Sequence, residues 1–135
     1  MEAGSMGYEV IELVQGKTGI EIPLASGNWV MLREEGYSPV QSLAAAVGAC
    51  GAYVYQSVLN NSKVPYKFQR VTVNYKRDEE RQSQPLKEIE IIFYVEIAAD
   101  LQERALRAAK LIGPNCPVMQ SLDPQIKISE VVEFI

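Results

Sequence analysis

The chain has 135 residues, 47% of them hydrophobic, and its 17 acidic and 13 basic side chains leave a formal net charge of −4. This length suits one domain with one hydrophobic core, and the acidic balance argues against general electrostatic binding to nucleic acid or to an anionic membrane. Because the sequence has no histidine and only two cysteines, it excludes catalytic pairs that need imidazole and makes a transition-metal site improbable. We therefore expect no metal and no cofactor, which leaves thiol or carboxylate chemistry, or none.

Residues 1–7 are interpreted as a leader or a remnant of cloning, and residues 8–135 as a single domain. The longest apolar run, Leu43 to Tyr55, is shorter than the roughly 20 residues that cross a bilayer. It also begins too far along the chain to be a signal peptide. We expect a cytoplasmic protein without a membrane partner.

Three short strands are predicted at the start of the domain, over residues 8–15, 20–24 and 29–33. Their β-branched and aromatic residues are separated by two groups of turn residues, at 16–19 and 26–28, which is typical of an antiparallel meander. Residues 34–37 then link the third strand to the most apolar part of the chain.

A long helix is predicted to begin after Ser38 and to continue to about Asn61. Ser38, Pro39 and Gln41 match an N-cap, a first helical residue and a capping-box partner. Every residue over 43–54 is apolar or small. A helix that is apolar on all sides is expected to be buried on all sides, so we interpret it as the central core helix.

The second half of the chain predicts strands over 67–76 and 86–98, joined by a charged, solvated hairpin loop. Asp100 and Glu103 predict a second capping box, and Gly113-Pro114 the end of the helix that it starts. Pro117 then suits the first position of a short helix with Cys116 at its N-cap, and a closing strand is predicted over 125–134. The order of elements indicates an α+β fold, in which a long buried helix lies against a curved, mostly antiparallel sheet. The apolar face of the 86–98 strand is Ile89, Ile91, Phe93, Val95 and Ile97.

The two cysteines leave alternatives open. Cys50 is either a small core residue, which burial would make inert, or a reactive thiol that needs a cation or a donor from elsewhere. Cys116 is either a loop residue without a role or a thiol that a helix N-terminus favours as thiolate. If the two thiols meet, one can reduce an oxidant and become a sulfenic acid, and the other can condense with it to a disulfide.

The segment from Ser38-Pro39 to Ala49-Cys50, together with Asn115-Cys116-Pro117-Val118, resembles the OsmC/Ohr family of osmotically inducible and organic-hydroperoxide-resistance proteins. The resemblance covers residues 8–134. It implies an intertwined homodimer with active sites at the subunit interface. It further implies that Cys50 is the peroxidatic thiol, that Cys116 is the resolving thiol, and that a dithiol such as a lipoylated protein supplies electrons for the reduction of organic hydroperoxides.

Two positions depart from the family pattern. Val40 stands where the hydroperoxide reductases carry a glutamate after the helix-opening proline, and Lys17 stands in the first hairpin where they carry an arginine. By resemblance Lys17 is the candidate cation beside the reactive thiol, and Arg33 is another possible cation. With these two departures the chain resembles a divergent OsmC-like branch more than it resembles the efficient peroxidases of the family. The alternative function is a catalytically weak protein that senses redox state or binds a hydrophobic small molecule.

Overall fold

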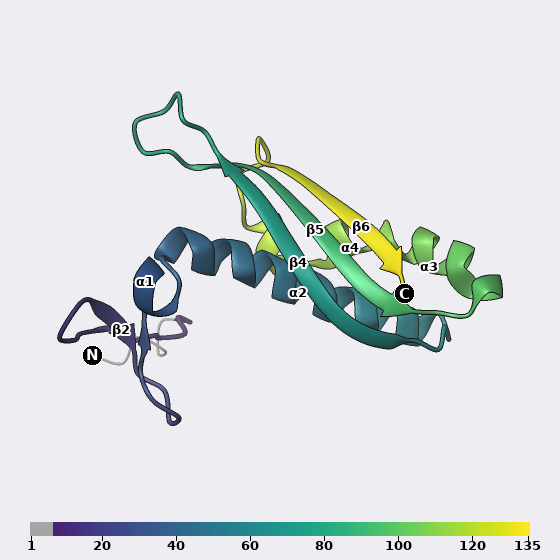
Figure 1. The fold of residues 1–135 in the computed structure, drawn as a ribbon, viewed down its shortest axis with the longest axis horizontal. Coiled ribbons are helices and arrows are strands. Elements are labelled where there is room, and N and C mark those ends of the chain that lie inside the picture. The colour runs from purple at the N-terminus through teal and green to yellow at the C-terminus, as the bar shows by residue number, and fades with distance from the viewer. Residues whose placement is uncertain (1–6) are drawn as a thin grey trace. The chain divides into compact units, whose positions relative to one another are not determined.

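The computed structural model describes residues 7–135 (Figure 1), so the expectation of a leader falls, except for Gly7, outside the described residues. The chain forms two compact units, one up to Ser42 and one from Leu43 to Ile135. Each unit is described by itself below. The expectation of a single domain over residues 8–135 stays a prediction.

The first unit contains three short strands, β1 (Val14–Gln15), β2 (Ile20–Ile22) and β3 (Trp29–Val30). They pair antiparallel in the order β1-β2-β3, which confirms the predicted meander, although each strand is shorter than expected. The predicted link after β3 is instead a short helix, α1 (Arg33–Gly36). The Trp29 indole N–H donates to the Gly36 carbonyl, so α1 is fastened to the sheet.

Within residues 7–42 no side chain is buried. Two- and three-residue strands without a core are marginally stable in water at best. The apolar side chains of this unit therefore need a surface outside it to pack against. Those most exposed are Tyr8, Val10, Ile11, Leu13, Ile20, Leu24, Leu32 and Tyr37.

The long helix α2 (Pro39–Asn61) begins where the sequence predicts. The capping box is confirmed, because the Gln41 N–H donates to Ser38 Oγ at 3.1 Å and the Ser38 N–H donates to Gln41 Oε1 at 2.9 Å. Among the described helices α2 alone is long and apolar enough to cross a membrane by length and composition, a test that the core helix of a soluble protein also passes.

The expectation that α2 is buried on all sides was wrong. Leu43 and Tyr53 are 42% and 74% exposed. The physical reason is that the elements of the second unit cover one side of the helix and leave the opposite side open. The buried side consists of Ala44, Val47, Gly48, Gly51, Ala52, Tyr55 and Leu59.

The sheet of the second unit contains β4 (Lys67–Arg77), β5 (Leu86–Glu96) and β6 (Lys127–Phe134). Strands β4 and β5 form the predicted antiparallel hairpin, and β6 pairs parallel to β5. Figure 1 shows α2 running along this sheet. The predicted apolar face of β5 is confirmed, since its five members, Ile89, Ile91, Phe93, Val95 and Ile97, are all buried. The opposite face carries charges, and Glu88 lies 3.8 Å from both Lys76 and Lys127.

One charged residue lies on the core side of the sheet. Glu130 of β6 pairs with Ile91 of β5, and residues paired across two strands share a face of the sheet. Burial raises the pKa of the Glu130 carboxyl above its ordinary range. The alternation of β6 predicted the flanking residues Ile128 and Val132 for this face, but it did not identify Glu130.

Between β5 and β6 the chain forms a 3₁₀ turn, η2 (Ala99–Leu101), followed by three helices, α3 (Gln102–Ala109), α4 (Ile112–Asn115) and α5 (Pro117–Gln120). The second capping box was wrong, because the 3₁₀ turn starts the helix and no side chain caps η2 or α3. The helix end at Gly113-Pro114 was also wrong, since both residues lie inside α4. Pro114 is tolerated there because the first turn of a helix does not use its N–H groups.

Candidate functional site

The two thiols of the chain come together in the second unit. Cys50 lies in the middle of α2, and Cys116 occupies the junction of α4 and α5, where it is the N-cap of α5 as predicted. The Cys50 thiol lies close enough to the Cys116 thiol to raise the pKa of Cys116. Both cysteines are free thiols. The arrangement therefore brings together two sulfur atoms that are 66 positions apart in the sequence.

A glycine next to Cys50 allows this approach. A Cβ atom on Gly51 would lie 3.1 Å from Met119 Cε of α5 and 3.4 Å from Phe93 Cζ of β5. A Cβ there would make a tight contact with the flexible end of Met119 and an ordinary one with Phe93, so a side chain larger than that of alanine would have no room. The small residue beside Cys50 therefore helps α5, which begins directly after Cys116, to approach α2.

The two thiols differ in their access to solvent. Cys116 is fully buried, with 0% of its surface exposed, whereas Cys50 is half-buried. A solute that approaches from outside can contact Cys50 but not Cys116. Geometry thus distinguishes an accessible thiol from a sheltered one.

The expectation that the helix N-terminus favours the thiolate of Cys116 was wrong. Burial, and next the neighbouring thiol of Cys50, raise the pKa of Cys116. The backbone N–H groups of Met119 and Val118 lower this pKa, but the Cys116 side chain makes no N-cap hydrogen bond with α5. Their effect is smaller than that of desolvation, because burial removes the water that would stabilise the thiolate.

The candidate cation Lys17 lies in the first unit, in the turn between β1 and β2. The Gly16 N–H donates to the Gly19 carbonyl at 2.8 Å across this turn, and Lys17 itself is exposed. Arg33 begins α1, and Val40 is the second residue of α2. The role of Lys17 toward Cys50 stays a prediction.

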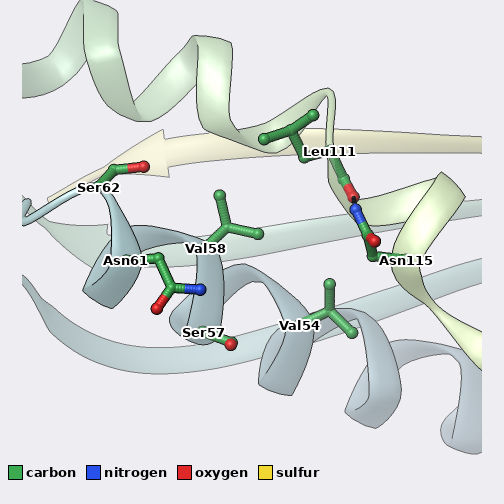
Figure 2. Close-up of a pocket in the computed structure, with 7 residues that line it drawn as sticks. All are labelled: Val54, Ser57, Val58, Asn61, Ser62, Leu111 and Asn115. Atoms are coloured by element: carbon green, nitrogen blue, oxygen red, sulfur yellow. Dashed lines mark hydrogen bonds between the residues drawn. The ribbon is translucent and has the colours of Figure 1, made fainter.

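A pocket of about 370 Å³ lies between the C-terminal half of α2 and the α3–α4 junction, and neither Cys50 nor Cys116 lines it. Figure 2 shows Val54 and Val58 pointing from α2 toward Leu111 and Asn115. Val54 is four residues after Cys50, and Asn115 directly precedes Cys116. The sequence analysis missed this pocket, although α2 becomes polar after Tyr55. Its seven lining residues are Val54, Ser57, Val58, Asn61, Ser62, Leu111 and Asn115.

No metal site accompanies the thiols in the described part of the chain. Over residues 7–135 no three or more His, Cys, Asp or Glu side chains gather closely enough to hold a metal ion. The chemistry that the arrangement offers is that of two adjacent thiols, one of which is accessible.

The family model described as OsmC-like protein matches residues 32–131. No curated protein matches the chain significantly. The solved structures that it resembles include an OsmC like protein from Mycoplasma pneumoniae, with a TM-score of 0.74, 14% identity and coverage of 95% of this chain and 97% of that chain.

Two further structures show the same fold. A hypothetical protein from Aquifex aeolicus VF5 has a TM-score of 0.69 and 21% identity, with 95% of this chain and 99% of that chain covered. The organic hydroperoxide resistance protein OhrB of Bacillus subtilis has a TM-score of 0.61 and 16% identity, with 92% and 96% covered. At these identities the likeness extends to the α+β fold, which agrees with the fold class predicted from the sequence.

Proposed function

The chain belongs to the OsmC-like protein family, as its cysteine motifs predicted, and from this premise we propose that it is a thiol peroxidase that reduces organic hydroperoxides. One observation carries the proposal: the half-buried Cys50 lies close enough to the buried Cys116 to raise the pKa of the Cys116 thiol. The structurally similar proteins from Bacillus subtilis and Legionella pneumophila, both described as organic hydroperoxide resistance proteins, support the same substrate class.

The proposed cycle has two steps on the protein. The Cys50 thiolate attacks the distal oxygen of the hydroperoxide, the O–O bond breaks, and the alcohol leaves with a proton while Cys50 becomes a sulfenic acid. The Cys116 sulfur then attacks the Cys50 sulfur, a disulfide forms, and the sulfenic oxygen leaves as water. A dithiol, such as a lipoylated protein, restores both thiols and is itself oxidised to a disulfide.

The difference between the thiols fits this order of events. An accessible sulfur has to meet the hydroperoxide, and only Cys50 of the pair is accessible. The raised pKa of Cys116 keeps this thiol protonated near neutral pH, so it does not compete for the oxidant, because thiolates are the nucleophiles. The proximity of the two thiols then favours formation of the disulfide after the first step.

We further propose that the working molecule is a homodimer. The first unit has no buried side chain over residues 7–42 and exposes many apolar ones. On α2, Leu43 and Tyr53 are exposed on the side away from the core. A second copy of the chain would cover both surfaces. Lys17, of the same chain or of the partner, is the proposed cation that favours the Cys50 thiolate.

The test of peroxidase activity is stopped-flow reduction of cumene hydroperoxide, with dithiothreitol as the electron donor. The wild type is expected to consume the peroxide and Cys50→Ser to lose nearly all of this activity. Cys116→Ser is the matched variant, because in the absence of dithiothreitol it should still react once and accumulate a sulfenic acid that dimedone traps. Equal rates for the wild type and Cys50→Ser would reject the proposal.

A second candidate function rests on the pocket between α2 and the α3–α4 junction. In this alternative the protein binds a small organic molecule or senses oxidants, without rapid turnover. Native mass spectrometry of the purified protein that finds a bound small molecule, together with no Cys50-dependent turnover, would favour it.

A further inference from the structure

The segment that carries Cys116 is held by hydrogen bonds from its own side chains. Within the described residues, three such bonds connect positions over 111–121. Asn115 Nδ2 donates to the Leu111 carbonyl at 2.8 Å, and both residues precede Cys116 (Figure 2). Ser121 Oγ donates to the Pro117 carbonyl at 2.7 Å, and both residues follow Cys116. Neither of these two bonds joins one side of the cysteine to the other.

The third bond does join the two sides of Cys116. Gln120 Nε2 donates to the Gly113 carbonyl at 2.9 Å, and the same oxygen accepts from the backbone N–H of Cys116 at 3.3 Å. Gln120 lies four residues after the cysteine, and Gly113 lies three residues before it. A single carbonyl group therefore holds both the backbone of Cys116 and the end of α5.

We propose that Gln120 is a positioning residue, which holds the Cys116 sulfur toward Cys50 and thereby sets the rate at which the disulfide between them closes. The inference rests on the proposed peroxidase function and adds a residue to its second step. Gln120 is exposed, and it acts through the Gly113 carbonyl rather than on a sulfur atom.

Both sides of this segment are also anchored in the core of the second unit. Ile112 of α4 is fully buried and Met119 of α5 is 7% exposed. Between them, Pro114 and Pro117 lie exposed on either side of the buried Cys116. The two buried side chains hold α4 and α5 against the core, and the bond that spans the cysteine fixes how the two helices are oriented toward each other.

The chemistry of the second step makes this orientation important. A disulfide needs the two sulfurs at about 2 Å with a specific dihedral angle, so its rate depends on how well the attacking sulfur is oriented. Cys116 attacks the sulfenic acid of Cys50, the S–S bond forms, the S–O bond breaks, and water leaves with the thiol proton. The first step, in which Cys50 attacks the hydroperoxide, does not use Cys116. Loss of the bond from Gln120 should therefore slow the second step alone.

A slower second step has a chemical signature. A sulfenic acid that persists can meet a second hydroperoxide, whose distal oxygen is transferred to the Cys50 sulfur while the O–O bond breaks and the alcohol leaves. The product is a sulfinic acid, which Cys116 cannot convert into the disulfide. A variant without the bond should therefore accumulate more sulfinic acid at Cys50 than the wild type.

The experiment uses Gln120→Met, which keeps the length of the side chain and removes its N–H donor. The reduced protein is mixed with cumene hydroperoxide in the absence of dithiothreitol. Consumption of the peroxide measures the first step, and the disappearance of dimedone-reactive sulfenic acid measures the second. The variant should keep the first rate within about two-fold and slow the second by roughly three- to ten-fold, the net effect of one hydrogen bond. Mass spectrometry at excess peroxide should show more sulfinic acid at Cys50.

Ser121→Ala is the matched control. It removes a hydrogen bond of the same segment that does not span Cys116, and Ser121 is exposed, as Gln120 is. Both of its rates should stay within about two-fold of the wild type, and chemical denaturation should give similar free energies of unfolding for the two variants. Equal slowing of the second step in both variants, or slowing of both steps in Gln120→Met, would overturn the positioning role.

Failure of the proposed function has a different signature. If the wild type consumes no peroxide through Cys50, oxidised glutathione replaces the peroxide. Cys50 attacks it, a mixed disulfide forms and one glutathione leaves; Cys116 then attacks the Cys50 sulfur, and the second glutathione leaves as the disulfide closes. Slower closure in Gln120→Met than in Ser121→Ala would support the positioning role without any peroxidase turnover. Equal closure in the two variants, or none in the wild type, would overturn it.

Discussion

Tyr55 shows how a single residue fastens the central helix to its neighbours. Its side chain is fully buried, its ring centroid lies 5.2 Å from that of Phe93, and its hydroxyl donates to the Ala105 carbonyl at 2.9 Å. Burial raises the pKa of Tyr55 to about 12. The residue therefore joins α2, β5 and α3 through its ring and one hydrogen bond.

Tyr55→Phe is expected to lower the free energy of unfolding by roughly 1–2 kcal/mol, because the Ala105 carbonyl loses its buried partner. The wild type should also lose stability as the pH rises from about 10 through about 12, since the neutral phenol is favoured in the folded state and the unfolded chain ionises first. Urea titrations at pH 7 and at pH 11 measure both effects. Tyr55→Phe should lack the part of the stability loss at alkaline pH that the ionisation of Tyr55 causes. An equal decrease in the free energy of unfolding between pH 7 and pH 11 in both proteins would contradict this assignment.

The candidate site shows what could be predicted at the scale of residues. The pairing of Cys50 with Cys116 follows from the family resemblance, and the effect of Cys50 on the pKa of Cys116 agrees with it. The ionisation of Cys116 could not be predicted from its N-cap position, because the outcome depends on how completely other elements bury the sulfur. Strand alternation puts residue 130 on the same face as Ile128 and Val132, but a charged side chain is not expected in a core, and the register of β6 against β5 shows that Glu130 lies on the core side.

At the scale of elements, α2 and the sheet approach each other closely at two glycines. A Cβ on Gly48 would lie 2.3 Å from Val73 Cγ2, whereas a Cβ on Gly51 would lie 3.1 Å from the flexible end of Met119. A branched valine on a strand has little freedom to move aside, but a methionine side chain adapts readily. The two glycines therefore differ in how much they tolerate substitution.

Gly48→Ala is expected to destabilise the protein by roughly 1–3 kcal/mol through overpacking. Gly51→Ala is its matched control and should change stability by less than about 1 kcal/mol, because the gain in helix propensity offsets a mild contact. Chemical denaturation of both variants measures the difference. If Gly48→Ala and Gly51→Ala lost the same amount of stability, the difference between Val73 and Met119 would not explain how well each glycine tolerates substitution.

The element boundaries show which local sequence signals are sufficient to predict where a helix begins. The capping box of α2 formed because Ser38 and Gln41 satisfy each other within one turn. The second capping box did not form, because the 3₁₀ turn η2 directly precedes α3. The helix α1 was missed because its four residues carry too short a pattern for periodicity to detect.

At the scale of the whole molecule, the unsatisfied apolar surfaces are the central observation. The first unit exposes apolar side chains and buries none over residues 7–42, and one side of α2 remains open with Tyr53 74% exposed. Soluble monomers rarely leave such large apolar surfaces uncovered. We propose that a second copy of the chain packs against these apolar surfaces.

Sedimentation equilibrium should therefore give the mass of two chains of 15.0 kDa each. Tyr53→Glu should raise the dimer dissociation constant by roughly ten-fold or more, since a carboxylate would replace a large apolar contact. Lys87→Glu, an exposed change on β5, is the control and should leave the dimer intact. A monomeric wild type, or an unchanged dissociation constant for Tyr53→Glu, would contradict the homodimer.

The sequence by itself determined the elements whose signals are local. Alternation defined β4 and β5, the capping box defined the start of α2, and the two cysteine motifs predicted the family. Only the tertiary structure decided which sides of these elements are covered. The exposed side of α2, the ionisation of Cys116, the parallel pairing of β6 and the pocket between α2 and the α3–α4 junction all depend on contacts between residues far apart in the chain, and a local pattern carries no information about such contacts.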